Sequence, residues 1–225
     1  MWPGGSEASY SGLPHVAHWR GAVWIGLVTG LAAEARIAAP LGPTLAGGGT
    51  THGAEAAARR LARAGARALV SFGLAGGLDP SLAPGTLIIP AEVYDDEVAY
   101  PCDAALASRW GTMAGRLLAS HEAVTSAAGK ARLFAVTGAR AVDMESGAVA
   151  RVAREFNLPF ACLRAICDPA ARTLPPAARV ALDPSGRISP LRLLASLART
   201  PGQIPELIAL GRDAAAARRT LRALR

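Results

Sequence analysis

The chain has 225 residues, of which 51% are hydrophobic and 18% are charged. This length fits one compact domain with a sizeable core, and the composition excludes an intrinsically disordered chain. The sequence has neither a run of about 20 apolar residues nor a basic start followed by an apolar run, so we expect no membrane span and no secretory signal. We therefore expect a cytoplasmic domain over residues 21–225, preceded by a flexible N-terminal extension over residues 1–20.

The net charge of +7 is concentrated near the C-terminus. Residues 186–225 contain 8 basic and 2 acidic side chains, whereas residues 1–185 contain 16 basic and 15 acidic ones. A basic segment of this kind is attracted to phosphate groups and to anionic membrane surfaces. Nucleic acid is not expected as a partner, because aromatic residues make up only 5% of the chain and none follows Phe160 to stack on bases.

The cysteines and histidines do not form a metal-binding pattern. The three cysteines, Cys102, Cys162 and Cys167, give neither an even disulfide framework nor a CxxC pair. The four histidines have no repeating ligand spacing. We therefore expect no metal and no cofactor.

Apolar runs rich in strand-forming residues alternate with helical patterns along the chain. We expect strands at residues 22–28, 68–72, 86–89, 141–144 and 159–166. We expect helices from residue 32 onward and over residues 54–64, 104–119 and 147–156, and a glycine-rich turn over residues 73–77. Because continuous apolar strands alternate with helices, the sequence predicts a single α/β domain with a mixed, mainly parallel central sheet flanked by helices.

The C-terminal segment, residues 187–225, is predicted to be helical, with interruptions at Pro201 and Pro205. Apolar side chains recur there every three or four residues, and most arginines lie outside that stripe. The stripe consists of Leu207, Leu210, Ala214, Ala217, Leu221 and Leu224. The favoured interpretation is a terminal helix that packs on the sheet or on a second subunit. The alternative is a basic amphipathic helix that brings the protein to a membrane surface.

Three carboxylates, Glu34, Glu145 and Asp168, are each predicted to follow a strand. Ligand sites of parallel sheets lie outside the carboxyl ends of the strands, so these side chains can converge although they are far apart in sequence. The alternative for each one alone is an acidic residue that complements a helix dipole. The glycines of residues 73–77 let a ligand approach the backbone, but this segment is not GxGxxG and does not predict a dinucleotide site.

Three segments resemble the nucleoside phosphorylase and nucleosidase superfamily, in the branch that includes methylthioadenosine/S-adenosylhomocysteine nucleosidase. These segments are SFGLAGGLDPSLAPGTLIIP at residues 71–90, AVDMESGAVARVAREFNLPF at residues 141–160 and CLRAICDPA at residues 162–170. The resemblance spans residues 23–170. Three motifs in the same order, each at the end of a comparable strand, are more specific than any one of them.

The motif VDMES, together with the C-terminal segment, most resembles the hopanoid-associated phosphorylase family. That segment reads SPLRLLASLARTPGQIPELIALGRDAAAARRTLRAL. The family is implicated in removing adenine from adenosylhopane, which leaves a ribosyl or phosphoribosyl hopane. The resemblance implies an enzyme of hopanoid biosynthesis that cleaves the N-glycosidic bond of a 5′-substituted adenosine, and it implies a homo-oligomer. A lipid-linked substrate would also explain a basic amphipathic helix that contacts the inner face of the membrane.

The resemblance assigns two catalytic residues. Cleavage of the bond between ribose and adenine makes C1′ cationic while charge builds on the departing base. Asp168 matches the family's aspartate that protonates or hydrogen-bonds adenine at N7, and burial would raise its pKa toward that task. Glu34 matches the glutamate that, in hydrolytic members, orients and deprotonates water for attack at C1′.

The resemblance also assigns residues that bind substrate. Glu145 would accept hydrogen bonds from both ribose hydroxyls, and its charge would favour the cationic sugar, with Met144 against the ribose face. Ala75 and Gly76 would line the nucleoside through their backbone. Cys167 stands where nucleosidases often have serine, which removes a good hydrogen-bond donor, and we expect a packed thiol there rather than a nucleophile.

The nucleophile is water or inorganic phosphate. Bacterial phosphorylases of this superfamily carry a Gly-Asp-x-x-Arg loop near the first strand, and the sequence has none, which favours water. Arg36 and Arg164 are the candidates for holding phosphate as a co-substrate. Phe134 is the candidate for stacking on adenine. The alternative functions are a soluble methylthioadenosine/S-adenosylhomocysteine nucleosidase and a non-catalytic nucleotide-binding module.

Overall fold

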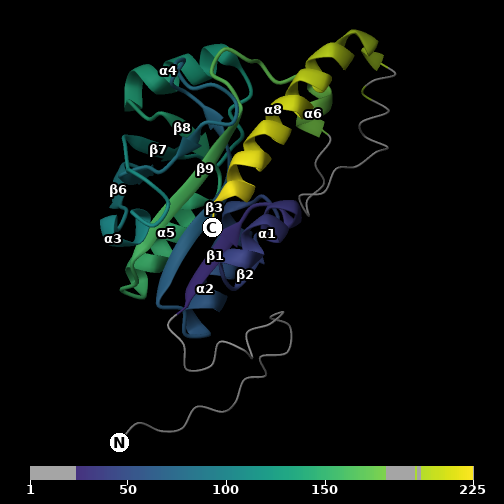
Figure 1. Cartoon of the computed structure of the whole chain (residues 1–225). Coiled ribbons are helices and arrows are strands. Elements are labelled where there is room, and N and C mark those ends of the chain that lie inside the picture. The colour runs from purple at the N-terminus through teal and green to yellow at the C-terminus, as the bar shows by residue number, and fades with distance from the viewer. Residues whose placement is uncertain (1–23, 181–195, 197–198, 225) are drawn as a thin grey trace, which may run out of the picture.

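The computed structural model describes residues 24–180, 196 and 199–224 (Figure 1). The predicted N-terminal extension and the start of the predicted C-terminal helical segment lie outside the described residues. The strands are β1 Ile25–Thr29, β2 Thr44–Ala46, β3 Ala68–Gly77, β4 Leu87–Ile88, β5 Glu92–Asp95, β6 Val98–Pro101, β7 Arg116–Ala119, β8 Ala141–Asp143 and β9 Phe160–Asp168. The helices are α1 Ala32–Ala38, α2 Thr51–Arg63, α3 Ala104–Ala107, α4 Ala127–Thr137, α5 Ser146–Glu155, α6 Pro176–Val180 and α8 Ile204–Ala223, with short 3-10 helices at Ala39–Leu41 and Pro201–Gln203.

The strands form one mixed sheet whose main path runs β2-β1-β3-β8-β7-β5-β6. The longest pairing joins β3 and β9 in parallel, from Leu69 opposite Phe160 to Gly76 opposite Asp168. Parallel pairing also joins β1 to β2 and β3, and β7 to β5 and β8. Antiparallel pairing joins β3 to β8, β4 to β9 and β5 to β6. The predicted mixed, mainly parallel sheet is confirmed.

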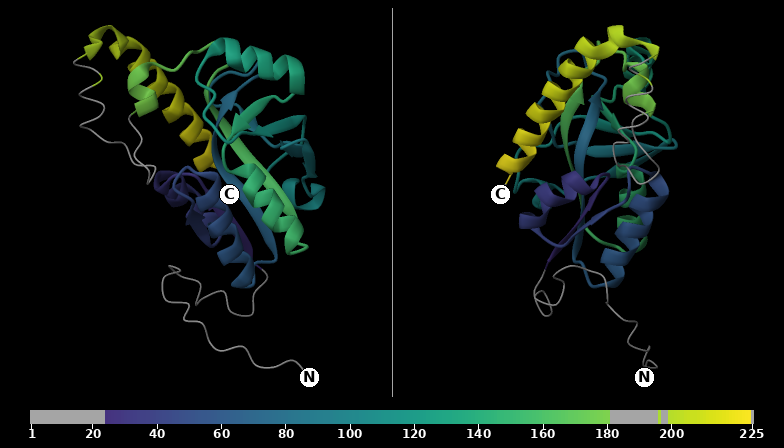
Figure 2. Two further views of the ribbon diagram at one scale, coloured as in Figure 1. Left: turned by 180° about the vertical axis from the view of Figure 1, so that it is seen from behind. Right: turned by 90° about the vertical axis from the view of Figure 1, so that its right-hand side faces the viewer.

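Helices cover both faces of this sheet, and each face has its own hydrophobic core (Figure 2). One core joins α2 and α5 to the sheet and contains Leu61, Val149 and Ile166. The other joins α1 and α8 to the opposite face and contains Phe72 and Leu221. Because β3 and β9 contribute alternate side chains to the two cores, they are buried on both faces, which explains their continuous apolar sequences.

The glycine-rich segment of residues 73–77 is the end of β3 and not a turn, so that prediction is wrong. Gly73 and Gly76 pair with β9 on one side, and Gly76 and Gly77 pair with β8 on the other. Gly73 and Gly76 have close neighbours: a Cβ atom would lie 2.8 Å from Arg164 Nη1 at the first and 3.4 Å from Val142 Cγ1 at the second. The glycines therefore keep this strand end open to side chains that enter from neighbouring elements.

The predicted helix over residues 104–119 is also wrong. Helix α3 ends at Ala107, and the chain continues into strand β7. Gly111 and Gly115 have φ angles of +145° and +70°, which interrupt any helix between them. Strand β7 then forms because it pairs in parallel with both β5 and β8.

Helix α8 packs against β9 and α1, as the favoured interpretation of the C-terminal segment predicts (Figure 1). Its contact face is centred on the buried side chains of Ala217 and Leu221. Pro205 lies in the first turn, where its missing N–H has no helical partner to lose. None of the helices in the described part of the chain has the length and apolarity needed to cross a bilayer.

Candidate active site

A cavity of about 310 Å³ lies at the carboxyl ends of β1, β3, β8 and β9. Its lining includes all seven residues that the sequence assigns to the site, Glu34, Ala75, Gly76, Met144, Glu145, Cys167 and Asp168. Strand ends that are far apart in the chain therefore meet around one hollow. The parallel pairing of β1, β3 and β9 brings Glu34 and Asp168 to one edge, whereas Glu145 follows β8, which pairs antiparallel with the end of β3.

Glu34 lies in the first turn of α1, and both of its carboxylate oxygens accept backbone hydrogen bonds. Oε2 accepts from the Leu31 N–H at 2.8 Å, and Oε1 accepts from the Leu74 N–H at 3.1 Å. Burial raises the pKa of Glu34 above its usual range, although these hydrogen bonds and Arg164 lower it. The carboxylate thus complements a helix N-terminus and also links α1 to the open end of β3.

Glu145 follows β8 and lies at the N-terminus of α5. A Cβ atom on Gly30 would lie 2.6 Å from Glu145 Oε1 and 3.4 Å from Glu34 Oε2. The glycine therefore lets both carboxyl groups approach the same point above the backbone. Burial raises the pKa of Glu145 to about 7, and the neighbouring Asp143 contributes to the rise, whereas Arg164 opposes it. Glu145 therefore keeps its proton to a higher pH than an exposed glutamate does.

Arg164 is a buried guanidinium that organises this side of the cavity. Nε donates to Asp143 Oδ2 at 2.5 Å, and Nη2 donates to Ser71 Oγ at 2.7 Å and to Ser146 Oγ at 3.0 Å. Glu145 Oε2 lies 3.7 Å from Nη2. Nη1 is buried and has no hydrogen-bond partner among the described residues. The charge-assisted network fixes the guanidinium while it leaves one amino group uncommitted.

Asp168 ends β9 and is held by Lys130 of α4. Lys130 Nζ donates to Asp168 Oδ2 at 2.5 Å, and the two side chains are 0% and 9% exposed. Oδ1 of Asp168 is buried and has no hydrogen-bond partner in the described part of the chain. Burial raises the pKa of Asp168 above its usual range, although Lys130 opposes the rise. One carboxylate oxygen is therefore engaged, and the other remains able to bond a ligand.

Met144, Gly76 and Cys167 are three further residues that the sequence assigns to the site. The Met144 carbonyl accepts a hydrogen bond from Thr51 Oγ1 at 3.0 Å, which ties the β8 end to α2. Gly76 lies opposite Asp168 where the β3–β9 register shifts. Burial raises the pKa of the Cys167 thiol to about 12, so this side chain stays protonated, as expected of a packed thiol.

Apolar side chains from segments without a sequence assignment complete the lining. They include Val124, Leu174, Ala178 and Leu210. Leu210 belongs to the apolar stripe predicted for the C-terminal segment. For the other three residues, no pattern in the sequence indicates a place in the site. Phe134 instead lies in a small cluster around Leu78, Ala139 and Val142, and it is not among the described residues that line the cavity. The assignment of Phe134 as the stacking residue is therefore wrong.

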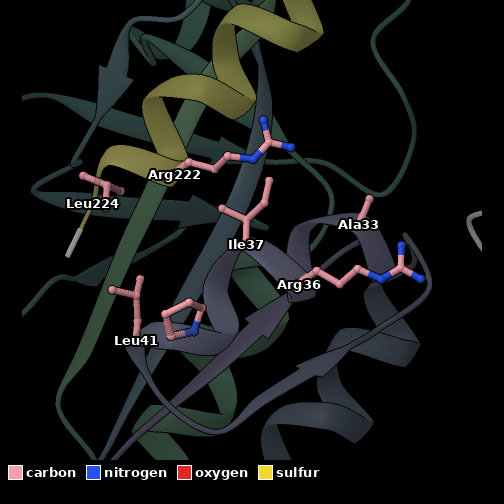
Figure 3. Close-up of a pocket in the computed structure, with 7 residues that line it drawn as sticks. Ala33, Arg36, Ile37, Leu41, Arg222 and Leu224 are labelled. Carbon is pink, nitrogen blue, oxygen red and sulfur yellow. The ribbon is translucent and has the colours of Figure 1, made fainter.

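The two arginines proposed to hold an anion lie in different places. Arg164 is beside the carboxylates, whereas Arg36 is exposed and lines a separate groove of about 830 Å³. Figure 3 shows this groove between α1 and the end of α8, with Ile37, Arg222 and Leu224 around it. Arg36 is absent from the described lining of the carboxylate cavity, so the structure does not bring the two guanidinium groups to one phosphate.

Within the described residues, one cluster has the composition of a metal site, and it lies where the turn between β5 and β6 meets the segment after β7. Ligand atoms of Asp95, Asp96 and His121 all lie within 4.8 Å of one another. Asp95 is already paired with Arg151, and Asp96 lies 3.0 Å from His121 Nε2. These ion pairs account for the cluster, and the expectation of no metal stays a prediction.

The structure is similar to solved structures of nucleosidases. The 5′-methylthioadenosine/S-adenosylhomocysteine nucleosidase of Neisseria meningitidis, in complex with methylthio-immucillin-A, gives a TM-score of 0.63 at 16% identity, over 88% of this chain and 96% of that chain. The futalosine hydrolase of Helicobacter pylori gives a TM-score of 0.63 at 16% identity, over 89% of this chain and 96% of that chain. The S-adenosylhomocysteine nucleosidase of Streptococcus pyogenes gives a TM-score of 0.62 at 14% identity, over 86% of this chain and 97% of that chain. At these identities the likeness establishes the fold.

A comparison with curated proteins found no match. The family model of the Phosphorylase superfamily matches residues 27–129 and 110–183, which include most of β1 and all of β3, β8 and β9. These are the strands whose ends surround the cavity. The chain therefore belongs to the phosphorylase superfamily, and it is an enzyme of the class that cleaves N-glycosidic bonds.

Proposed function

We propose that the protein hydrolyses the N-glycosidic bond of a 5′-substituted adenosine, releases adenine, and acts on adenosylhopane. One observation carries the proposal: Glu34, Glu145 and Asp168 line a single cavity of about 310 Å³. That volume lies at the lower end of the range of small-molecule pockets, about 300 to 1,000 Å³, and suits a nucleoside.

The Glu34 and Glu145 side of the cavity is suited to a sugar cation. As the bond to adenine lengthens, positive charge develops at C1′ and on the ring oxygen. Glu34 and Glu145, together with Asp143, supply three carboxyl groups around the single guanidinium of Arg164. When Glu34 and Glu145 are ionised, the carboxylates outnumber the cation, and this side then favours the transition state over the neutral nucleoside.

Water is the nucleophile that fits these side chains. A Cβ atom on Gly73 would lie 2.8 Å from Arg164 Nη1 and 3.0 Å from Glu34 Oε2, so no side chain separates these two groups, and Glu34 faces the cavity in which a water molecule would bind. Arg164 would orient that water, and Glu34 would take its proton as the oxygen attacks C1′. A phosphate dianion would meet the same excess of carboxylates, which makes phosphorolysis the weaker alternative.

The Asp168 side is suited to the departing base. Its Oδ1 atom has no hydrogen-bond partner among the described residues, and burial raises the pKa of the carboxyl group. A protonated Oδ1 would donate to adenine N7 as electrons leave C1′, and the carboxylate that remains would pair with Lys130. The proton thus moves from Asp168 to N7 while water bonds to C1′ and the C1′–N9 bond breaks.

Adenosylhopane is supported by the C-terminal segment. Leu210 of α8 lines the cavity together with Leu174 and Ala178, so the segment that resembles the hopanoid-associated family reaches the site. A pentacyclic hydrocarbon does not fit a 310 Å³ cavity in addition to a nucleoside, so it would extend past these apolar side chains. We further propose that the enzyme is a cytoplasmic homo-oligomer and that it works at the inner membrane face. Flotation with anionic and neutral liposomes tests the membrane contact.

A second candidate is a soluble nucleosidase for methylthioadenosine or S-adenosylhomocysteine. The observation that favours it is the fold, which is similar to solved nucleosidases whose names carry these substrates. It would use the same three carboxylates.

One assay separates these candidates. The protein is incubated with adenosylhopane or methylthioadenosine, with and without inorganic phosphate, and free adenine is measured. We expect adenine from adenosylhopane without any need for phosphate. In the Asp168→Asn variant we expect kcat to fall about 10²- to 10⁴-fold, the range of general acid catalysis, with nucleoside binding kept. No adenine from either nucleoside, or full activity of Asp168→Asn, would overturn the proposal.

A further inference from the structure

Lys130 is the only lysine among the 24 basic residues of the chain, and its side chain is fully buried. It lies in the first half of α4, a helix that contributes no other fully buried side chain. A buried ammonium is costly unless each of its protons is hydrogen-bonded and its charge is paired. The buried ammonium of Lys130 is therefore expected to have hydrogen-bond acceptors and an opposite charge beside it.

All three ammonium protons of Lys130 have acceptors. Nζ donates to Asp168 Oδ2 at 2.5 Å, to the Pro169 carbonyl at 3.1 Å and to the Arg172 carbonyl at 2.9 Å. Three acceptors around one nitrogen match a compact ammonium, and they do not match the planar five-donor guanidinium that every other basic residue of this chain presents. Lysine is thus the side chain that this arrangement of acceptors requires.

The contact with Asp168 divides the two carboxylate oxygens into different roles. Oδ2 accepts from Lys130, so a proton on Asp168 is directed to Oδ1, which has no partner among the described residues. When Oδ1 gives up that proton, the negative charge that forms is already paired with the ammonium. Lys130 therefore makes Asp168 a stronger acid and fixes which oxygen acts.

We propose that Lys130 is a positioning residue that selects Oδ1 of Asp168 as the acidic oxygen and stabilises the carboxylate left after proton transfer to the leaving base. This inference rests on the proposed release of adenine. It assigns to α4 a part in the reaction, although α4 itself supplies no proposed catalytic residue.

Other charged groups near Asp168 are arranged so that Lys130 is the dominant partner. Arg172, in the loop after β9, pairs with Asp213 of α8 at 2.5 Å, and the two have opposite effects on Asp168. Cys167 is the adjacent titratable group on β9, and burial keeps its thiol protonated. Removal of Lys130 should therefore move the titration of Asp168 upward, since burial would no longer be opposed by the ammonium.

The test compares Lys130→Met with Arg132→Met, which removes the same charge from an exposed position on the same helix. We measure kcat for adenine release as a function of pH. Activity that needs protonated Asp168 falls as the pH rises through its pKa. In Lys130→Met this basic limb should move up by about 1 to 3 pH units, the usual effect of losing a close opposite charge, and kcat should fall at least tenfold. Arg132→Met should keep the parent profile.

A double variant separates this role from a purely structural one. If Lys130 acts through Asp168, Lys130→Met in an Asp168→Asn background should lower kcat no further, because the group it tunes is already gone. This comparison also applies if Lys130→Met alone does not fold, since the double variant leaves no unpaired buried charge. An additional loss in the double variant, or a Lys130→Met profile equal to that of Arg132→Met, would overturn the inference. Full activity of Asp168→Asn would instead overturn the proposed function.

Discussion

The two sides of the cavity bury carboxyl groups in different ways. On one side Glu34 and Glu145, with Asp143 beside them, surround the single guanidinium of Arg164. On the other side Asp168 has an ammonium of its own, that of Lys130. The first side keeps an excess of acidic groups, whereas the second is a matched pair. An excess of negative charge stabilises a cation, and a matched pair suits a group that must release and regain a proton.

The largest expected effect comes from Glu34→Gln. The substitution keeps the shape of the side chain and an oxygen for the Leu31 or Leu74 N–H, but it removes the base and one negative charge. We expect kcat for adenine release to fall about 10²- to 10⁴-fold with little change in KM, because the lost interactions act in the transition state.

Glu122→Gln is the matched control for this variant. Glu122 also lines the cavity, but it is exposed, and its side chain makes no ion pair in the described part of the chain. Its neutralisation should change kcat less than about threefold, as a screened surface charge does. If the two variants lose activity equally, the general negative potential of the cavity, and not a base at Glu34, would be responsible.

The side of the cavity built from strand ends could be predicted from the sequence. RAICDP places Asp168 at the end of a buried apolar run, and the parallel pairing of β9 with β3 brings it to the same edge of the sheet as the end of β1. VDMES also places Glu145 after an apolar run, but β8 pairs antiparallel with β3, so Glu145 reaches this edge because β8 pairs with the last residues of β3. The same two motifs contain Asp143 and Arg164. Their pairing is set by the lateral order of β8, β3 and β9, which no local pattern encodes.

The region between β4 and β8 could not be predicted in the same way. The alanines and leucines of residues 104–119 favour a helix, but the positive φ angles at Gly111 and Gly115 and the pairing of β7 with two neighbours override that preference. The β5–β6 turn uses positive φ at Asp96 and Glu97, without the glycine or asparagine that signals a hairpin. The sequence also gives no role to Lys130, because its partner Asp168 lies 38 positions away and no local pattern connects the two residues.

A smaller effect should appear in stability as a function of pH. The pKa of Glu145 is raised from 4.5 to about 7, so the folded protein holds a proton there that the unfolded chain releases. The stability that this contributes is fully present below pH 4.5 and is lost as the pH rises through 7. We expect Tm to fall between pH 5 and pH 8, by about 2 to 4 °C for each kcal/mol lost.

Glu145→Gln isolates this contribution, because the raised pKa values of Glu34 and Asp168 act with the same sign in both proteins. Thermal unfolding followed by circular dichroism should show a shallower fall of Tm with pH in the variant. Equal slopes in the two proteins would show that Glu145 holds no proton in this range, which would contradict the rise of its pKa.

The smallest effect concerns the apolar lining that α8 contributes to the cavity. Leu210 is half-buried on α8 and lines the cavity, whereas Leu207, one turn earlier, is also half-buried but does not belong to the described lining. If a hydrocarbon on the 5′ carbon leaves the cavity past Leu210, then Leu210→Ala should raise KM for adenosylhopane about 3- to 10-fold, as expected for part of a leucine's burial. Methylthioadenosine, whose 5′ group is small, should be affected less than twofold, and Leu207→Ala should change neither substrate. An equal rise for both nucleosides would place Leu210 against the adenosine itself, because only a contact shared by both substrates weakens both alike.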